Sequence, residues 1–338
     1  MRYSSRLFLY APLFALLALA VAAGLQWRAV AGGLETWLRQ NNGHKIAPGV
    51  TLHFASESVS GFPFNVDVVL GNVTFTVQSA RTSGSWHTDA FAIHELTFGR
   101  TQQIYEAAGT QTITWTDAEG GVHRLAFVPG SLRASAILAH GRLVRFDLDL
   151  NAIGAREVSG ARVQLHFRKS PDRDAIDIVA SANQLHLSPT LGAGFGGELH
   201  HANMTASLVP AQPVAALFAG RESWDQALEA WRRDGGAFCL DDLEMTWTEA
   251  RLRARGRLGL DSDHRPQGAI SLDLDGTVKA PAADVPDDRL ARAIAQLTKV
   301  TNGAPRTFSI RIFSGTVNLQ LTKTPQITKD AGLLGPLY

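Results

Sequence analysis

Cysteine is nearly absent from this 338-residue chain, and the one that is present, Cys239, cannot form a disulfide within the chain. Charged residues make up only 19% of the sequence, and the formal net charge is +1. Proteins that bind nucleic acid usually carry a strongly basic face, and no basic patch with interleaved aromatic residues occurs here. Packing must therefore hold the folded part together, and nucleic acid is not an expected partner. Cys239 lies in an apolar run, which predicts a small buried core residue rather than a reactive thiol.

Motifs that carry catalytic chemistry are missing as well. The sequence contains no Walker loop, dinucleotide-binding glycine fingerprint, paired-cysteine motif, His-Glu-x-x-His zinc motif or Gly-x-Ser-x-Gly elbow. The glycine-rich segment 192–197 lacks the Lys-Ser/Thr ending of a phosphate loop and indicates a turn. The neighbours His200 and His201 would point to opposite faces of a strand, which disfavours a metal site. We therefore name no catalytic residue, metal or cofactor, and we expect that the protein is not an enzyme.

A long apolar segment is present at the N-terminus. Residues 7–25 carry no charge, with Arg2 and Arg6 before them and Arg28 just after. As a helix they would be about 28 Å long, close to the hydrocarbon thickness of a bilayer. Basic residues favour the cytoplasmic side, so residues 1–25 predict one span of the inner membrane, with the N-terminus cytoplasmic and the remainder periplasmic. The predicted anchor residues are Leu7, Leu13, Leu16, Leu19, Leu25 and, at the membrane surface, Trp27.

A second interpretation of this segment stays open. A positive start, an apolar run and the small-residue triplet 20–22 also describe a secretory signal that is cleaved after Ala22. The retained anchor is favoured because the apolar run continues to Leu25 and an aromatic residue follows it at Trp27.

Helical periodicity continues beyond the anchor. Apolar residues recur at three- and four-residue spacing over residues 26–42, which predicts a juxtamembrane amphipathic helix. Its apolar stripe either packs on the exported domain or lies on the membrane surface, and packing is favoured. The stripe consists of Trp27, Val30, Leu34, Trp37 and Leu38.

Strict alternation of apolar and polar residues dominates the rest of the chain, as in half-buried strands. The clearest examples are Val144–Leu150 and Ala161–Phe167. Further strands are predicted at 51–56, 64–70, 73–77, 91–98, 176–180, 243–260, 269–278 and 308–321. The fold class is therefore mainly β (α+β): an N-terminal transmembrane helix followed by a long, curved antiparallel sheet with a few short helices.

Two short helices interrupt the predicted strands. Ser223 can cap a helix over 224–233, and Pro286 opens another that continues to Leu297. The first helix divides the exported part into two β-rich units, 43–222 and 223–338, which are expected to pack together.

One predicted hairpin covers residues 251–279, and its turn carries Asp261 and Asp263. These two acids resemble a fragment of a calcium loop. Pro266 and the missing glutamate at the twelfth position favour an ordinary polar turn instead.

The segment Gly61-Phe62-Pro63-Phe64 precedes one of the alternating strands. Pro63 cannot donate a backbone hydrogen bond, so it belongs at a sheet edge or a bulge. Phe62 and Phe64 either fill the core at a structural corner or form the rim of an apolar groove. In the second interpretation they are the candidates for ligand contact.

The same segment carries a resemblance. The anchor that leads into Trp27 and Trp37-Leu38, the segment Ser60–Phe64 and the hairpin strand Gly268–Leu272 together resemble the bacterial family known as domain of unknown function 2125. The resemblance implies a membrane-anchored envelope protein and supplies no activity. The strand-rich hairpins are also loosely similar to AsmA-like proteins, whose long curved sheets are associated with lipid handling.

Two functions fit this architecture. In the first, a membrane-anchored envelope protein binds a lipid or another apolar ligand in a β-sheet groove. About ten buried methylenes would contribute about 8 kcal/mol, enough for micromolar affinity. In the second, the protein is an envelope scaffold with a closed core that recruits other proteins. Lipid binding is favoured, and the expected partners are the membrane, a lipid and envelope proteins.

Overall fold

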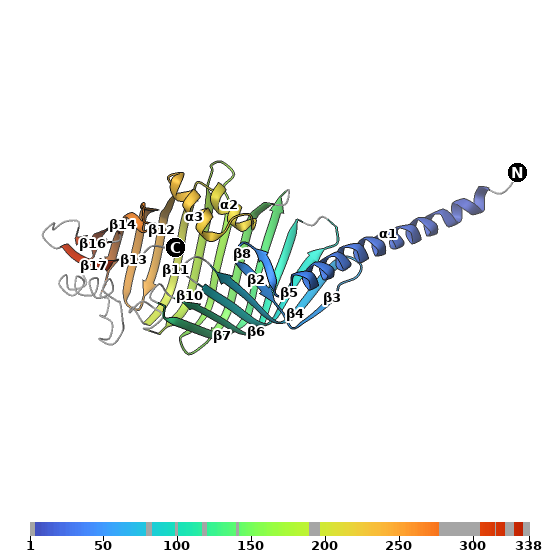
Figure 1. Ribbon diagram of the computed structural model, residues 1–338, viewed down its shortest axis with the longest axis horizontal. Helices are drawn as coiled ribbons and strands as arrows, with labels where there is room; N and C mark the ends of the chain where they lie inside the picture. The colour runs from blue at the N-terminus through green and yellow to red at the C-terminus, as the bar shows by residue number, and fades with distance from the viewer. Residues whose placement is uncertain are drawn as a thin grey trace.

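An antiparallel sheet of seventeen strands forms the body of the molecule, and one long helix, α1 (Ser4–Asn41), extends from it (Figure 1). The computed structural model describes residues 4–78, 83–98, 101–116, 120–139, 142–188, 197–276, 305–314, 316–321 and 328–333. The sequence prediction of a mainly β fold with an N-terminal apolar helix is confirmed.

The strands follow one another across the sheet almost in chain order. Strands β2 and β3 both pair with β4, β1 pairs with β2, and from β4 to β17 each strand pairs with the next. Such neighbour-to-neighbour pairing is a meander, which needs only short turns. The bounds are β1 (His44–Ala47), β2 (Val50–His53), β3 (Ser56–Ser60), β4 (Asn65–Gln78), β5 (Ser83–Leu96), β6 (Gln102–Thr116), β7 (Val122–Ala139), β8 (Arg142–Gly154), β9 (Val158–Lys169), β10 (Ile176–Leu187), β11 (Gly197–Val209), β12 (Ala237–Trp247), β13 (Ala250–Leu260), β14 (Pro266–Asp275), β15 (Arg306–Phe313), β16 (Thr316–Leu321) and β17 (Thr328–Leu333).

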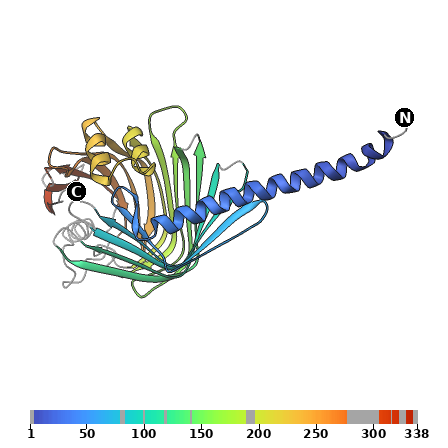
Figure 2. The same ribbon diagram turned by 45° about the vertical axis from the view of Figure 1, so that its right-hand side comes forward.

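The sheet is open and strongly curved, and the end of α1 enters the inside of the curve (Figure 2). Twist accumulates from strand to strand, so a sheet of this width cannot stay flat. Two short helices, α2 (Gln212–Phe218) and α3 (Trp224–Arg233), lie between β11 and β12 in the chain, at one end of the strands (Figure 1). Strands β11 and β12 nevertheless pair with each other, from Leu199 opposite Trp247 to Val209 opposite Ala237. The division into units 43–222 and 223–338 stays a prediction.

The last turns of α1 pack on the first strands. Ala31 and Leu38 are buried against Val66, Val68 and Leu70 of β4, in a cluster that also includes β2. The predicted stripe therefore packs on the sheet, as the favoured interpretation expected, through Trp27, Val30, Leu34 and Leu38; Trp37 is exposed.

Several predicted strands differ in extent from the observed ones. The segments 243–260 and 308–321 are each two strands, because Thr248 and Ser314 adopt positive φ angles at tight turns. Conversely, 64–70 and 73–77 belong to one strand, β4, which continues past Asn72 at a φ of 52°. The sequence analysis did not identify β1, β3, β6, β7, β11 or β17.

Helix α3 begins where the sequence predicted. Ser223 forms a capping box, in which its hydroxyl accepts from the backbone of Gln226 while the Gln226 side chain accepts from the backbone of Ser223. At the other end, Gly236 lies against Trp231, and a Cβ at this position would clash with the Trp231 ring. The predicted helix at 286–297 lies outside the described residues, as does most of the glycine-rich segment 192–197.

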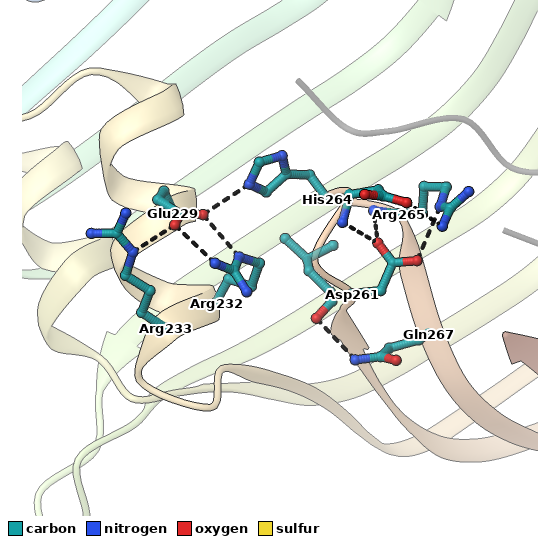
Figure 3. Close-up of polar contacts among 9 residues, drawn as sticks. Glu229, Arg232, Arg233, Asp261, His264, Arg265 and Gln267 are labelled. Atoms are coloured by element: carbon teal, nitrogen blue, oxygen red, sulfur yellow. Dashed lines mark hydrogen bonds and ion pairs between the residues drawn. The ribbon is translucent and has the colours of Figure 1, made fainter. Parts of the chain in front are cut away.

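A charged contact ties α3 to the β13–β14 turn (Figure 3). The carboxylate of Glu229 accepts hydrogen bonds from Arg232 and Arg233 of its own helix and lies 2.8 Å from Nε2 of His264 in the turn. This contact holds the helix over the ends of β13 and β14.

The turn itself is stabilised by Asp261, as the sequence interpretation expected. Its Oδ1 accepts from the backbone nitrogens of Asp263 and Arg265, and its Oδ2 accepts from Nε of Arg265 (Figure 3). Burial opposes ionisation, but these hydrogen bonds outweigh it and lower the pKa of Asp261. The acids therefore serve turn geometry.

Cys239 is not the core residue that its apolar flanks predicted. It is half-buried, and the pairing register places it opposite Ser207 and Arg257. Alternation along β12 sends Phe238 and Leu240 to the other face. The prediction was wrong because an apolar run in a strand contributes only every second residue to the core.

Candidate functional site

One face of the sheet, called the apolar face below, is apolar across thirteen consecutive strands. The pairing register allows one row of directly opposite residues to be followed from β4 to β16. At about 4.8 Å per strand, this row runs along an arc of roughly 58 Å. Tyr105 supplies the only hydroxyl group in the row. The row is Val68, Ile93, Tyr105, Ala134, Leu148, Leu165, Ala180, Met204, Leu243, Ala254, Leu272, Phe308 and Leu321.

Two helices cover parts of the apolar face. The last turns of α1 lie on β4 and β5, as described above. Helix α2 lies on the ends of β8 to β10, where the ring centroids of Phe218 and Phe167 are 6.0 Å apart. Between these helices, the described residues leave much of the face only half-buried, including Tyr105, Leu148 and Leu165.

The most open positions of the apolar face lie on β4 and β6, at the end of the strands away from the β3–β4 turn. Ile113 is paired between Trp86 and Leu125, and 37% of it is exposed. Trp115 and Val77, on the same face, are also exposed. The sequence analysis missed these residues, although the alternation in Thr112-Ile113-Thr114-Trp115-Thr116 was readable.

A buried polar network interrupts the apolar face beneath Trp86. Gln111 accepts a hydrogen bond from Nε1 of Trp86 and donates to the hydroxyl of Thr88, and both Gln111 and Thr88 are fully buried. Thr88 in turn donates to backbone carbonyls beside the bulge in β6. The network is satisfied internally, so it fixes the bulge and offers no free group to a ligand.

A second polar group lies at the other end of the same strands. Tyr105 donates a 2.5 Å hydrogen bond to Gln103, whose amide nitrogen is 3.4 Å from the carboxylate of Glu95. Burial, together with the negative charge of Glu95, raises the pKa of Tyr105. The phenol therefore stays protonated, and the apolar face has a polar end close to the β3–β4 turn.

A cavity of about 730 Å³ lies beside the end of β12, the start of β13, the end of β14 and the start of β15. Met245, Leu252 and Leu274 line it from the apolar face, while Arg253 and Glu244 contribute charge. Its volume is within the range of small-molecule sites.

The opposite face of the sheet is polar and carries ion pairs between neighbouring strands. Asp149 accepts two hydrogen bonds from Arg162, which lower its pKa against the effect of burial. Asp147 lies 2.7 Å from Nδ1 of His166 on β9, and it also pairs with Arg145 of its own strand at 2.7 Å. Such cross-strand pairs fix the register and keep this side in water.

The ionisation of Asp147 makes the free energy of unfolding depend on pH. Burial raises the pKa of Asp147. The hydrogen bonds and charges of His166 and Arg145 lower it by more than burial raises it, so the net shift is downward. The ionised pair stabilises the folded chain above about pH 4, and this contribution is lost as the pH falls through the lowered pKa. We expect Asp147→Asn to cost about 1 kcal/mol at pH 7 and to flatten the loss of stability below pH 4.

Urea unfolding at a series of pH values measures this effect. Glu198→Gln is the control, because Glu198 is exposed and only loosely paired with His200, at 3.7 Å. Equal pH profiles for Asp147→Asn and the unsubstituted chain would rule out this role for Asp147.

Phe62 and Phe64 lie in the turn between β3 and β4, and Pro63 lies in this turn rather than at the sheet edge or bulge that was predicted. Both rings are exposed, at 62% and 68%, so they do not fill the core. The Phe62 ring lies 5.5 Å from that of Trp27. Their assignment to a ligand groove stays a prediction.

The predicted anchor residues all lie in α1. This helix contains a segment long and apolar enough to cross a membrane, and almost none of that segment is buried within the molecule. Trp27 is half-buried, and its Nε1 donates to the carbonyl of Asn65 at 2.7 Å. The described members of the set with exposed side chains are Leu13, Leu16, Leu19 and Leu25; Leu7 lies in the same helix.

Several of the described histidines take part in ordinary polar contacts. His201 lies 2.7 Å from the side-chain oxygen of Asn183, and His94 lies 2.7 Å from Asp67. Among the residues that the structure describes, no group of three or more histidine, cysteine, aspartate or glutamate side chains could hold a metal ion.

Comparison with known proteins gives one match. A family model described as an uncharacterized protein conserved in bacteria matches residues 27–324. No curated protein and no solved structure matches the chain. The matched span includes the part of α1 that packs on the sheet and strands β1 to β16.

Proposed function

The chain belongs to the bacterial family known as domain of unknown function 2125, and we propose that it is a membrane-anchored envelope protein that binds a lipid along the apolar face. In this proposal the protein is not an enzyme. Helix α1 crosses the inner membrane once, with the N-terminus cytoplasmic and the sheet in the periplasm. The basic residues Arg2 and Arg6 support this orientation.

The half-buried middle of the row, from Ile93 on β5 to Leu243 on β12, carries the proposal. An acyl chain is a flexible apolar rod, and a half-buried apolar band between two covering helices matches it in chemistry and shape. Each methylene moved from water to this band would contribute about 0.8 kcal/mol. A band on a curved sheet can contact many methylenes at once, which a single apolar residue cannot.

The alternative is an envelope scaffold, and one observation favours it. Much of the apolar face is already packed within the chain, including a cluster of buried residues that spans β10 to β16 and contains Ile178, Leu272 and Phe308. If side chains of the protein itself fill the whole face, the sheet edges and α1 would be the functional surfaces. The two hypotheses make opposite statements about the accessibility of Ile113.

Site-specific photocrosslinking separates them. With benzoylphenylalanine at position 113 of the full chain in its native membrane, we expect a crosslinked phospholipid, detected by the mass of the adduct. The same probe at Thr114, which points to the polar face, should give none. The full chain is required because Ala31 and Leu38 of α1 belong to the packed core. A protein adduct at position 113, without lipid, would favour the scaffold.

A further inference from the structure

Four large apolar side chains are exposed beside the point where α1 joins the sheet. They are Phe62 and Phe64 in the β3–β4 turn, and Leu96 and Phe98 at the end of β5, with 62%, 68%, 51% and 51% of their surfaces exposed. We call this group the membrane-proximal patch. Soluble proteins rarely expose large apolar residues together without a partner.

Hydrogen bonds hold the two segments of the patch side by side. The backbone nitrogen of Thr97 donates to the carbonyl of Phe64 at 2.8 Å, and its hydroxyl donates to the carbonyl of Pro63 at 3.2 Å. Thr97 itself is buried. The exposed rings are therefore presented by a fixed backbone and are not the tips of two independent loops.

The patch lies at the height where α1 would leave the bilayer. The Phe62 ring meets the Trp27 ring edge-on, and a Cβ on Gly24 would lie 3.7 Å from Phe62. Residues 24–27 end the apolar segment of α1. Tryptophan and other aromatic residues concentrate at this level of a membrane, where their rings reach the boundary between headgroups and acyl chains.

The local charges agree with this placement. The patch residues Phe62, Phe64, Leu96 and Phe98 are all uncharged, and Glu95, the one charged chain neighbour of the four, is buried. Arg28, one residue beyond Trp27, is exposed and forms no ion pair with any described residue. An arginine at this level can reach lipid phosphates while its stem stays along the apolar boundary.

We propose that the membrane-proximal patch inserts into the surface of the bilayer that α1 crosses. The patch then attaches the sheet to the membrane at a second point, which we call the seat. The patch continues the apolar surface of α1, so a bilayer fits it better than a protein partner. The seat also brings the Glu95 and Tyr105 end of the apolar face to the headgroups, from which a lipid could move onto the face. The proposal rests on α1 lying in a membrane, which is part of the proposed function.

Nitroxide labels on single cysteines test the seat in the full chain. Cys239→Ser removes the native thiol, and the labels are placed through Phe64→Cys, Phe98→Cys, Leu19→Cys and Val122→Cys in phosphatidylcholine–phosphatidylglycerol vesicles. Val122 is a matched control, since it is apolar and 72% exposed but lies at the opposite end of the strands. The measurement is relaxation by oxygen, which enters lipid, compared with relaxation by a nickel chelate, which stays in water.

We expect the labels at positions 64 and 98 to be relaxed more by oxygen than by nickel, as at position 19, while the label at 122 shows the reverse. Water-like labels at 64 and 98 together with a lipid-like label at 19 would overturn the seat and leave the anchor intact. A water-like label at 19 would overturn the anchor on which the seat depends. A lipid-like label at 122 as well as at 64 and 98 would also overturn the seat, because lipid contact would then not be confined to the patch.

Discussion

Replacing Ile113 with aspartate is expected to remove bound lipid from the protein while leaving the sheet folded. Ile113 is exposed on the apolar face, so the new carboxylate can reach water in the free protein and costs little stability. In the lipid complex the same carboxylate would face an acyl chain, at a cost of about 3 kcal/mol. That cost corresponds to roughly a hundredfold loss of affinity.

The matched control is the next residue. Thr114 points to the polar face and lies opposite Arg124, so Thr114→Asp adds the same charge on the other side of the same strand. Lipid that copurifies with each variant is quantified by mass spectrometry, and folding is checked by thermal unfolding. Loss of lipid from both variants, or from neither, would contradict the assignment of Ile113 to a lipid site. Unfolding of Ile113→Asp would make Ile113 an ordinary core residue.

A charge at Val68 is expected to unfold the same protein. Val68 is completely buried between α1 and the sheet, in contact with the cluster that contains Leu38. An aspartate there would have no cation and no water, and an unpaired buried charge costs about 3–5 kcal/mol. Because whole domains are stable by only about 5–15 kcal/mol, we expect a large fall in the midpoint of urea unfolding.

Val69 provides the control for this experiment. It is adjacent in the chain, points to the other face, and is 41% exposed. Val69→Asp should change the free energy of unfolding by no more than about 0.5 kcal/mol. A similar loss of unfolding free energy in both variants would contradict the assignment of Val68 to a buried face of β4 and of Val69 to an exposed one.

Much of this fold could be predicted from local patterns. The alternation along β8 and β9 and the periodicity of α1 report directly which side chains are buried, because a strand repeats every two residues and a helix every 3.6. Strands β6 and β7 escaped prediction for a physical reason. A bulge between Ala108 and Gln111 shifts the alternation of β6 by one residue, so the readable alternation over 112–116 does not continue through the strand; β7 has a register shift of its own between Phe127 and Leu132.

The candidate site could be predicted only in part. The segment Gly61–Phe64 was identified as unusual from its composition, but its contact with Trp27, which is 34 to 37 residues earlier in the chain, could not be. The apolar row depends on the pairing of thirteen strands, and no single strand contains it. Alternation predicts that each strand has an apolar side; only the register shows that these sides form one continuous band.

The mass of the full chain with its bound molecules tests the central claim most directly. The protein would be extracted from its native membrane in a mild detergent, washed to remove loosely associated lipid, and measured by native mass spectrometry, with the released lipids identified separately. The account predicts stoichiometric phospholipid on the unsubstituted chain and on Thr114→Asp, but not on Ile113→Asp. A lipid-free mass for a chain that unfolds cooperatively would contradict it and would indicate a scaffold with a closed core.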